Sequence, residues 1–226
     1  MMRPLLVLRP EPGNAASVAA ARAMGLTVLG TPLFAIDAVP WTVPDPAAFA
    51  GILAGSANLF RLAGPGLARL ARLPVLAVGA ETAQAAQDAG FAVAQVGEGG
   101  LAEVARNLAP GRYLRLSGAD PAPLAPPPGV AVETITVYAA RPLPLDPAAQ
   151  ALLQGPCVVA LHSGEAARHF AAECARLGLA RGNVALACLA PRIGPKAGPG
   201  WQAVEISAKR RDQPLLALAR QMCQNL

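Results

Sequence analysis

The sequence repeats itself at long range, and this repeat limits the folds that the chain can adopt. The segment ILAGSA at residues 52–57, an apolar run ending in a small turn with a serine, is echoed by VALHSG at residues 159–164. A repeat of about 107 residues is too long for a solenoid and fits a duplicated domain. Two similar domains favour a cleft between them, where small molecules usually bind. Two further pairs of segments are related in the same way: residues 74–79 with 184–190, and residues 5–9 with 112–116.

Length and hydropathy place the chain among soluble proteins. Each half of the 226 residues is long enough to bury a core of its own. Hydrophobic residues make up 54% of the sequence, but no apolar stretch reaches the roughly 20 residues that span a bilayer. The start lacks a signal peptide, because charged residues and prolines at 9–12 follow only a few apolar residues. We therefore expect a cytoplasmic protein without a membrane partner.

Cysteine spacing and charge exclude several classes of function. The four cysteines form no CxxC motif, and Cys157 and Cys188 lie in apolar runs, so we expect reduced, buried thiols. The two histidines, His162 and His169, are too few for a metal site, and the carboxylates are isolated, which disfavours a paired acid–base site. The net charge of +5 is scattered apart from residues 209–211, and no platform of aromatic and basic residues predicts a nucleic-acid partner.

Short apolar runs alternate with helical patterns along the chain, which predicts βαβ units and parallel sheets. The runs are apolar on both faces, as expected of strands covered by helices. Residues 121–129 hold five prolines, which argues against a helix there. We expect strands at 5–8, 27–29, 51–54, 75–78, 92–96, 113–116, 130–138, 157–161, 184–188 and 203–206. We expect helices at 15–24, 57–62, 80–89, 101–108, 165–177 and 214–224.

Two extended, proline-containing stretches interrupt this alternation, at residues 31–44 and 132–147. If they lie side by side, they form a two-stranded bridge between domains. The chain would then leave the first domain early and return to it later. This arrangement predicts one domain from residues 1–36 and 139–226, and another from residues 37–138. The sequence is equally compatible with two continuous halves.

The candidate functional residues lie in turns that follow the predicted strands. The sequence has no phosphate-binding glycine loop, no dinucleotide fingerprint, and no zinc-protease or serine-hydrolase motif. Turns at the carboxyl ends of parallel strands commonly bind ligands, and each such turn also opens a helix whose free N–H groups attract anions. Alternatively, Ser56, Thr82 and Ser163 only cap helices. The turns contain residues 9–11, 55–58, 79–82, 117–120, 162–165 and 190–192, and together they predict a polar cleft for a polycarboxylate.

Six segments in order give the chain a resemblance to the uroporphyrinogen-III synthase family of tetrapyrrole biosynthesis. The similarity covers nearly the whole chain, and the VGAET turn followed by an alanine-rich helix is its most specific part. The segments are LLVLRPEPGNA, GILAGSANLFRL, LPVLAVGAETAQAAQDAGF, PGRYLRLSGAD, VETITVYAARPLP and VVALHSGEAARHF.

The resemblance implies two flavodoxin-like α/β domains joined by a two-stranded β linker. It implies a lyase that cyclises hydroxymethylbilane to uroporphyrinogen III, losing water and inverting ring D, with no metal or organic cofactor. It further implies a monomer that makes transient contact with the preceding deaminase. Catalysis by positioning a reactive substrate requires no strong acid–base pair, which agrees with the absence of standard catalytic motifs.

The resemblance also assigns roles to particular residues. Tyr138 matches the family's tyrosine, which is thought to assist departure of the hydroxyl group by hydrogen bonding. Arg9 matches the arginine that follows the first strand, and it is either a partner for a substrate carboxylate or a surface charge or local ion pair. The residues expected to bind substrate are Arg9, Ser56, Asn58, Thr82, Ser117, Gly118, Ser163 and Arg192.

The chain departs from the family pattern at three positions. Leu8 replaces the usual threonine, Ser117 replaces the arginine of an LRG turn, and Ile193 stands where a hydroxyl is common. The helix that follows is expected to be broken by glycine and proline at 194–195 and 198–200. Because of these departures, the chain could instead be a non-catalytic relative of the family, either a tetrapyrrole-binding protein or a regulatory one. A pair of receiver-like signalling domains is disfavoured, because Glu11 stands alone after the first strand.

Overall fold

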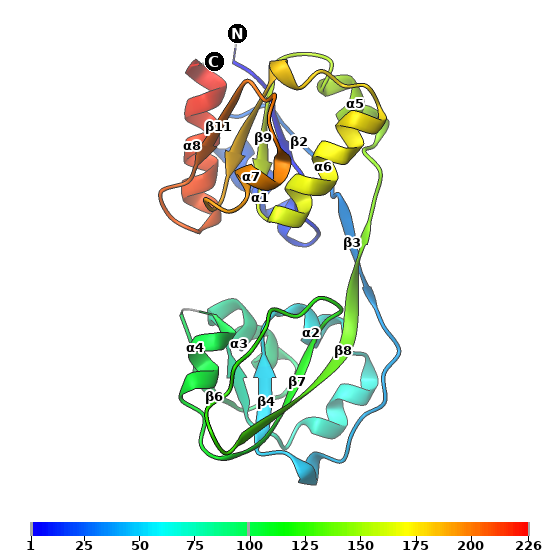
Figure 1. Ribbon diagram of the computed structural model, residues 1–226, viewed down its shortest axis with the longest axis vertical. Helices are drawn as coiled ribbons and strands as arrows, with labels where there is room; N and C mark the ends of the chain where they lie inside the picture. The colour runs from blue at the N-terminus through cyan, green and yellow to red at the C-terminus, as the bar shows by residue number, and fades with distance from the viewer. Residues whose placement is uncertain (1, 99, 226) are drawn as a thin grey trace. The chain divides into compact units, whose positions relative to one another are not determined.

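The computed structural model describes residues 2–98 and 100–225. The chain divides into two compact units. Unit 1 comprises Met1–Ala35 and Arg141–Leu226, and unit 2 comprises Ile36–Ala140. Each unit contains a mainly parallel sheet with helices on both faces (Figure 1), so the predicted fold class of two α/β parallel-sheet units is confirmed.

Unit 1 has a five-stranded sheet in the order β11-β10-β9-β1-β2. All four pairings are parallel. Counted along the chain, this is the order 2-1-3-4-5 of flavodoxin-like sheets. The strands are β1 (Leu5–Val7), β2 (Val28–Gly30), β9 (Cys157–Leu161), β10 (Val184–Cys188) and β11 (Ala203–Ile206).

Helices cover both faces of this sheet because β9 and β10 are apolar on both sides and fully buried. One face packs against α1 (Gly13–Ala23) and α8 (Asp212–Asn225). The four cysteines are free and buried, and burial raises the pKa of the Cys157 thiol to about 12. The other face packs against α5 (Pro147–Leu152), α6 (Gly164–Arg176) and α7 (Gly194–Ala197), with η3 (Arg181–Asn183) preceding β10.

Unit 2 has a six-stranded sheet in the order β3-β8-β7-β4-β5-β6. One face packs against α2, η2 and α3, and the other packs against α4. The strands are β3 (Phe34–Ala38), β4 (Gly51–Ala54), β5 (Val75–Ala77), β6 (Val93–Val96), β7 (Gly111–Gly118) and β8 (Val130–Pro142). The helices are η1 (Pro46–Ala48), α2 (Asn58–Leu62), η2 (Pro65–Leu70), α3 (Ala80–Asp88) and α4 (Leu101–Arg106).

The sequence repeat corresponds to a repeat of sheet positions. The echoed segments pair β4 with β9, β5 with β10 and β7 with β1. The order β6-β5-β4-β7-β8 therefore matches β11-β10-β9-β1-β2 strand by strand, although the chain enters the two sheets at different strands. The direction of winding reverses between β1 and β9 in unit 1 and between β4 and β7 in unit 2. Such switch points are the usual ligand sites of open α/β sheets.

The chain passes between the units within β3 and β8. These strands are neighbours in the sheet of unit 2, where the Val39 N–H donates to the Val137 carbonyl at 3.0 Å. In unit 1 the Leu143 N–H donates to the Leu33 carbonyl at 2.8 Å. The two extended stretches recognised in the sequence are thus hydrogen-bonded to each other.

The predicted helices and strands all form, and the differences lie at short or capped segments. The sequence pattern did not predict α5, where the Asp146 carboxylate accepts from the Ala149 N–H at 2.7 Å and Pro147 opens the helix. A four-residue helix, α7, forms where only a broken helix was expected, and it ends at Gly198 in the left-handed region, with φ of 70°. Residues 119–129 contain no helix, as predicted.

Glu173 is expected to make part of the stability of unit 1 depend on pH. Its buried carboxylate accepts from Arg176 at 2.7 Å and from the Leu145 N–H at 2.9 Å. The Arg176 hydrogen bond outweighs burial and lowers the pKa of Glu173 to about 2. Because this pKa is below that of an unfolded glutamate, the stabilisation is full above a pH of about 4.5 and is lost as the pH falls towards 2.

We expect Glu173→Gln to lower the free energy of unfolding by about 2 kcal/mol at pH 7. The difference from wild type should narrow below pH ~4.5 and close near pH ~2, as measured by urea denaturation across this range. Glu165→Gln is the matched control, because Glu165 lies on the same helix in an exposed ion pair with Arg168. If the difference in unfolding free energy between Glu173→Gln and wild type stays constant with pH, the proposed role of the Glu173 charge is wrong.

Candidate active site

Three predicted site residues of unit 1 lie at the carboxyl edge of its sheet. Arg9 follows β1, Ser163 follows β9, and Arg192 lies between β10 and α7. Arg9 and Ser163 therefore flank the switch point between β1 and β9. Arg192 is exposed on the next strand-end turn.

A buried asparagine fixes the turn that carries Arg9. The Asn14 side-chain amide donates to the Val7 carbonyl at 2.9 Å and to the Arg9 carbonyl at 3.0 Å. Asn14 is only 3% exposed, so these bonds are shielded from water. The amide holds the end of β1 against the start of α1 and sets the position of Arg9.

The Arg9 side chain belongs to a polar network that local sequence patterns did not reveal. Its guanidinium lies 3.4 Å from Asp212 Oδ1 and donates to Ser17 Oγ at 3.2 Å. The Ser17 hydroxyl donates to Asp212 at 2.8 Å, and His162 Nε2 lies 2.7 Å from the same carboxylate. Burial opposes ionisation of Asp212, but the bonds from His162 and Ser17 and the Arg9 charge hold its pKa below the usual value. Asp212 therefore balances the charge of Arg9.

Ser163 is the N-cap of α6. Its hydroxyl accepts from the Ala166 N–H at 3.1 Å, and its backbone is extended. The side chain of Lys196 packs on the first turn of this helix, because a Cβ built on Gly164 would lie 3.2 Å from Lys196 Cγ. Ser163 thus has the capping role, and a ligand at this turn would also meet the Lys196 side chain.

In unit 2 the predicted residues gather at the carboxyl ends of β4, β5 and β7. Ser56 follows β4, and its hydroxyl accepts from the Asn58 N–H at 3.2 Å. Asn58 opens α2, and its side-chain oxygen accepts from Arg61 at 3.4 Å. Thr82 lies in the first turn of α3 and is only 5% exposed. The threonine is therefore largely covered, whereas Ser56 and Asn58 shape the turn itself.

Ser117 and Gly118, at the end of β7, meet Tyr138 of β8. A register shift after Ser117 sets Gly118 opposite Tyr138. A Cβ on Gly118 would lie 2.7 Å from Tyr138 Cε2, so the absence of a side chain lets the ring lie against the strand end. The buried Ser117 hydroxyl donates to the Gly118 carbonyl at 3.0 Å. Among the described residues the Tyr138 hydroxyl has no hydrogen-bond partner, so it is free to donate to a ligand.

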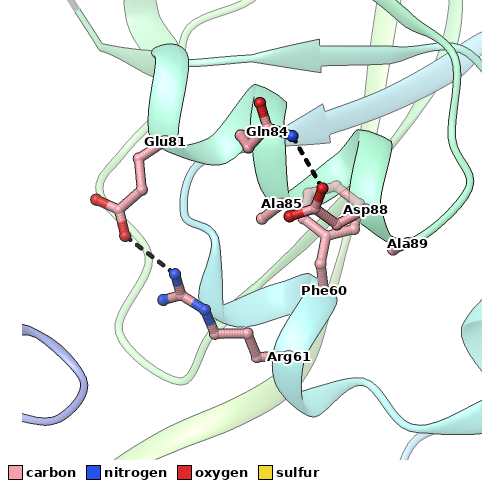
Figure 2. A pocket seen from close by; sticks show the side chains of 7 residues that line it. All are labelled: Phe60, Arg61, Glu81, Gln84, Ala85, Asp88 and Ala89. Carbon is pink, nitrogen blue, oxygen red and sulfur yellow. Dashed lines mark hydrogen bonds and ion pairs between the residues drawn. The ribbon is translucent and has the colours of Figure 1, made fainter.

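A separate pocket of about 480 Å³ lies between α2 and α3 (Figure 2). Arg61 and Glu81 form an ion pair across it at 3.2 Å, and Gln84 donates to Asp88 at 2.8 Å. Its two carboxylates against one guanidinium disfavour a polyanionic ligand. Its lining consists of Phe60, Arg61, Glu81, Gln84, Ala85, Asp88 and Ala89.

The described part of the chain holds neither a cluster of metal-ligating side chains nor a long apolar helix. Within residues 2–98 and 100–225, no group of three or more His, Cys, Asp or Glu side chains is placed to hold a metal ion. None of the helices in these ranges is long and apolar enough to cross a membrane.

Comparison with known proteins decides the family. The sequence model of a family described as uroporphyrinogen-III synthase HemD matches residues 15–217. The chain belongs to the uroporphyrinogen-III synthase family. The resemblance found in the sequence is therefore confirmed. No curated protein matches the sequence.

Solved structures of uroporphyrinogen-III synthases share the fold. One from Helicobacter pylori has 18% sequence identity and a TM-score of 0.65, and the match covers 98% of this chain and 100% of that one. A mutant synthase from the extremely thermophilic bacterium Thermus thermophilus has 20% identity and a TM-score of 0.54, with coverage of 99% and 100%. At these identities the likeness concerns the fold, and the roles of individual residues must come from the chain's own geometry.

Proposed function

We propose that this protein is a uroporphyrinogen-III synthase. In this proposal it cyclises hydroxymethylbilane to uroporphyrinogen III, with loss of water and inversion of ring D. The family match over residues 15–217 carries the proposal. The polar strand-end turns and the unpartnered Tyr138 hydroxyl support it, because they suit a substrate with many carboxylates and a departing hydroxyl group.

Tyr138 is the proposed proton donor. The C–O bond of the terminal hydroxymethyl group breaks as the phenol transfers its proton to the leaving oxygen, which departs as water, and the tyrosinate regains a proton from the pyrrole N–H as the azafulvene forms. The substituted α-carbon of ring D attacks the azafulvene carbon and gives a spiro intermediate. The bond from that α-carbon to the ring C methylene then breaks, the methylene bonds to the free α-carbon of ring D, and loss of one proton from this carbon restores the pyrrole with ring D inverted. The electron-rich pyrrole drives loss of the leaving group, so the proposed step uses no metal or organic cofactor.

In this proposal the other role of the enzyme is to position the bilane for ring closure. We propose that its acetate and propionate groups accept hydrogen bonds from the strand-end turns of both units, which include Ser56, Asn58, Thr82, Ser117, Gly118, Ser163 and Arg192. Each bond to a carboxylate contributes roughly 1.5–3 kcal/mol, so several modest contacts suffice to fold the chain for ring closure. Arg9 contributes less than its charge suggests, because Asp212 already balances that charge.

In this proposal units 1 and 2 are the two domains of a cytoplasmic, monomeric enzyme that makes transient contact with the preceding deaminase. Size-exclusion chromatography with light scattering measures the molar mass in solution and so tests whether the protein is a monomer. A stable dimer at micromolar concentration would contradict it.

A coupled assay tests the reaction directly. Porphobilinogen and its deaminase generate hydroxymethylbilane, and the products are oxidised and resolved as type I and type III uroporphyrins. We expect addition of this protein to convert the product from type I, which forms spontaneously, to type III. If only the type I isomer forms in the presence of this protein, the proposed activity is ruled out.

A non-catalytic tetrapyrrole-binding relative is the second candidate. Ile193 is 1% exposed and packs in the core of unit 1, so the turn after β10 offers no hydroxyl at this position. Binding of uroporphyrin without formation of the type III isomer would favour this alternative.

A further inference from the structure

Unit 2 buries an arginine that no carboxylate of the described residues neutralises. Arg115 lies on β7 and is 8% exposed. Its Nη1 donates to the Ala122 carbonyl at 2.9 Å, whereas its Nε is shielded from solvent and has no hydrogen-bond partner. Among residues 2–98 and 100–225 it forms no ion pair. A buried donor without an acceptor destabilises the fold, and an uncompensated buried charge destabilises it more.

The fold itself does not require a cation at this position. Arg115 pairs with Leu53 on β4, and the repeat aligns Leu53 with Ala160 on β9. Ala160 pairs in turn with Val7 on β1, so by sheet register Val7 is the unit 1 counterpart of Arg115. This register differs by one residue from the sequence echo of residues 5–9 and 112–116, which aligns Arg115 with Leu8, and Leu8 is fully buried as well. Val7 is fully buried in the apolar core beneath α1 and α8. The duplicated sheet therefore folds with valine where unit 2 has arginine.

The segment that covers this position of the sheet also differs between the two units. In unit 1 the helix α1 connects β1 to β2 and packs on Val7. In unit 2 the equivalent connection, residues 119–129, contains no helix, and Arg115 holds it through the Ala122 carbonyl. Its Leu124 packs against the cluster that contains Leu53. Arg115 thus lies under a proline-rich crossover, beside the switch point between β4 and β7.

The electrostatic setting of Arg115 contrasts with that of Arg9. Burial lowers the pKa of the Arg115 guanidinium, and the electrostatic interaction with Tyr138 opposes this shift. Arg9 stands at the equivalent switch point of unit 1, but it is paired with Asp212 at 3.4 Å. Of these two arginines, Arg115 is the one that still needs an anion.

We propose that Arg115 binds a carboxylate of the tetrapyrrole substrate through its Nε–H and Nη2–H groups. This inference rests on the proposed function and adds a substrate-binding residue to it. Because Nε has no exposed surface, the crossover at residues 119–129 must shift locally to admit the carboxylate. The bidentate geometry suits the planar guanidinium fork and relieves the buried charge.

The first test compares the affinity of Arg115→Met and wild type for uroporphyrin I, a closed tetrapyrrole with acetate and propionate side chains. We expect the variant to bind roughly 10- to 100-fold more weakly, as measured by fluorescence titration. Arg112→Met is the matched control, because Arg112 lies on the same strand in an exposed pair with Glu133. Its affinity should stay within about twofold of wild type.

Thermal stability separates a binding role from a structural one. If Arg115 serves the ligand, Arg115→Met should keep or raise the melting temperature, because an unpaired buried charge is replaced by an apolar chain such as unit 1 has at Val7. A lower melting temperature with unchanged affinity would show that Arg115 only holds the crossover, and would overturn the proposal.

A measurement on the wild-type chain avoids dependence on the folding of a variant. In ¹⁵N-labelled protein, the Arg115 Nε–H resonance, assigned by its loss in Arg115→Lys, should shift on addition of uroporphyrin I. The Arg112 Nε–H resonance should stay in place. No shift at saturation, or no binding of the porphyrin at all, would overturn the inference.

Different results would contradict the proposed function and the role of Arg115. If wild type gives no type III isomer in the coupled assay, the proposed function fails. If wild type gives type III and Arg115→Met gives it at the same rate and substrate dependence, only the role of Arg115 fails.

Discussion

Tyr138→Phe is expected to lower kcat for type III formation about 100-fold, which is the lower end of the range for loss of a proton donor. The ring still fits against Gly118 and the core of unit 2, so the melting temperature should stay within about 2 °C of wild type. The measurement is the initial rate of type III formation at saturating bilane, with thermal unfolding of the same sample. An unchanged rate would remove Tyr138 from the mechanism.

Gly118→Ala tests whether the position of this ring matters as well as its hydroxyl group. The new Cβ would lie 2.7 Å from Tyr138 Cε2, so the ring must move while the hydroxyl is retained. We expect kcat to fall about tenfold or more, since misplacing a catalytic group by about 1 Å is costly. In the Tyr138→Phe background the same substitution should add little, because both changes act on one group. Equal losses in both backgrounds would show that Gly118 acts independently of the tyrosine.

Gly30→Ala is expected to lower the free energy of unfolding by about 2–4 kcal/mol. A Cβ on Gly30 would lie 2.2 Å from Asn14 Oδ1 and 2.6 Å from Val18 Cγ2. Asn14 is buried and held by two hydrogen bonds to backbone carbonyls, so it cannot move aside without breaking them. The backbone of β2 at this position is compatible with alanine. The clash with Asn14 and Val18 of α1 is therefore what lowers the free energy of unfolding.

Gly182→Ala is the matched control for this substitution. No atom lies within 4 Å of a Cβ built on Gly182, so we expect a change within about 0.5 kcal/mol. Urea denaturation measures both variants. Because Asn14 also fixes the turn that carries Arg9, Gly30→Ala should raise the KM for the bilane as well. Equal stabilities of the two variants would show that the Asn14 contact is not rigid.

Local patterns in the sequence were sufficient for the secondary structure of most of the chain. The fully buried strands β4, β9 and β10 are continuous apolar runs, and α6 carries its buried residues on one face. These features depend on neighbouring residues, which is why their bounds agree with the prediction. The prolines of residues 121–129 likewise ruled out a helix in the crossover. The missed helix α5 is short, and its start depends on the Asp146 cap more than on periodicity.

The sequence also located the turns of the candidate site, because each turn follows a strand directly. It did not reveal what each side chain contacts. Arg9 was expected either to bind a substrate carboxylate or to be a surface charge or part of a local ion pair. It pairs with the distant Asp212, and the Ser17–Asp212 bond joins residues 195 apart. An acidic residue at the start of the last helix was the available signal, and by itself it indicates only a helix terminus.

By itself the sequence determined the duplication, the α/β class, the family and the strand-end location of the polar turns, because these follow from local periodicity and from ordered motifs. Only the tertiary structure decided that the two sheets have the same spatial order of strands, although the chain enters each sheet at a different strand. It also decided that Asp212 balances the charge of Arg9, and that Arg115 is buried under the crossover without a carboxylate. The physical reason is that burial and charge pairing depend on which distant segments fold against each other, and neighbouring residues do not carry that information.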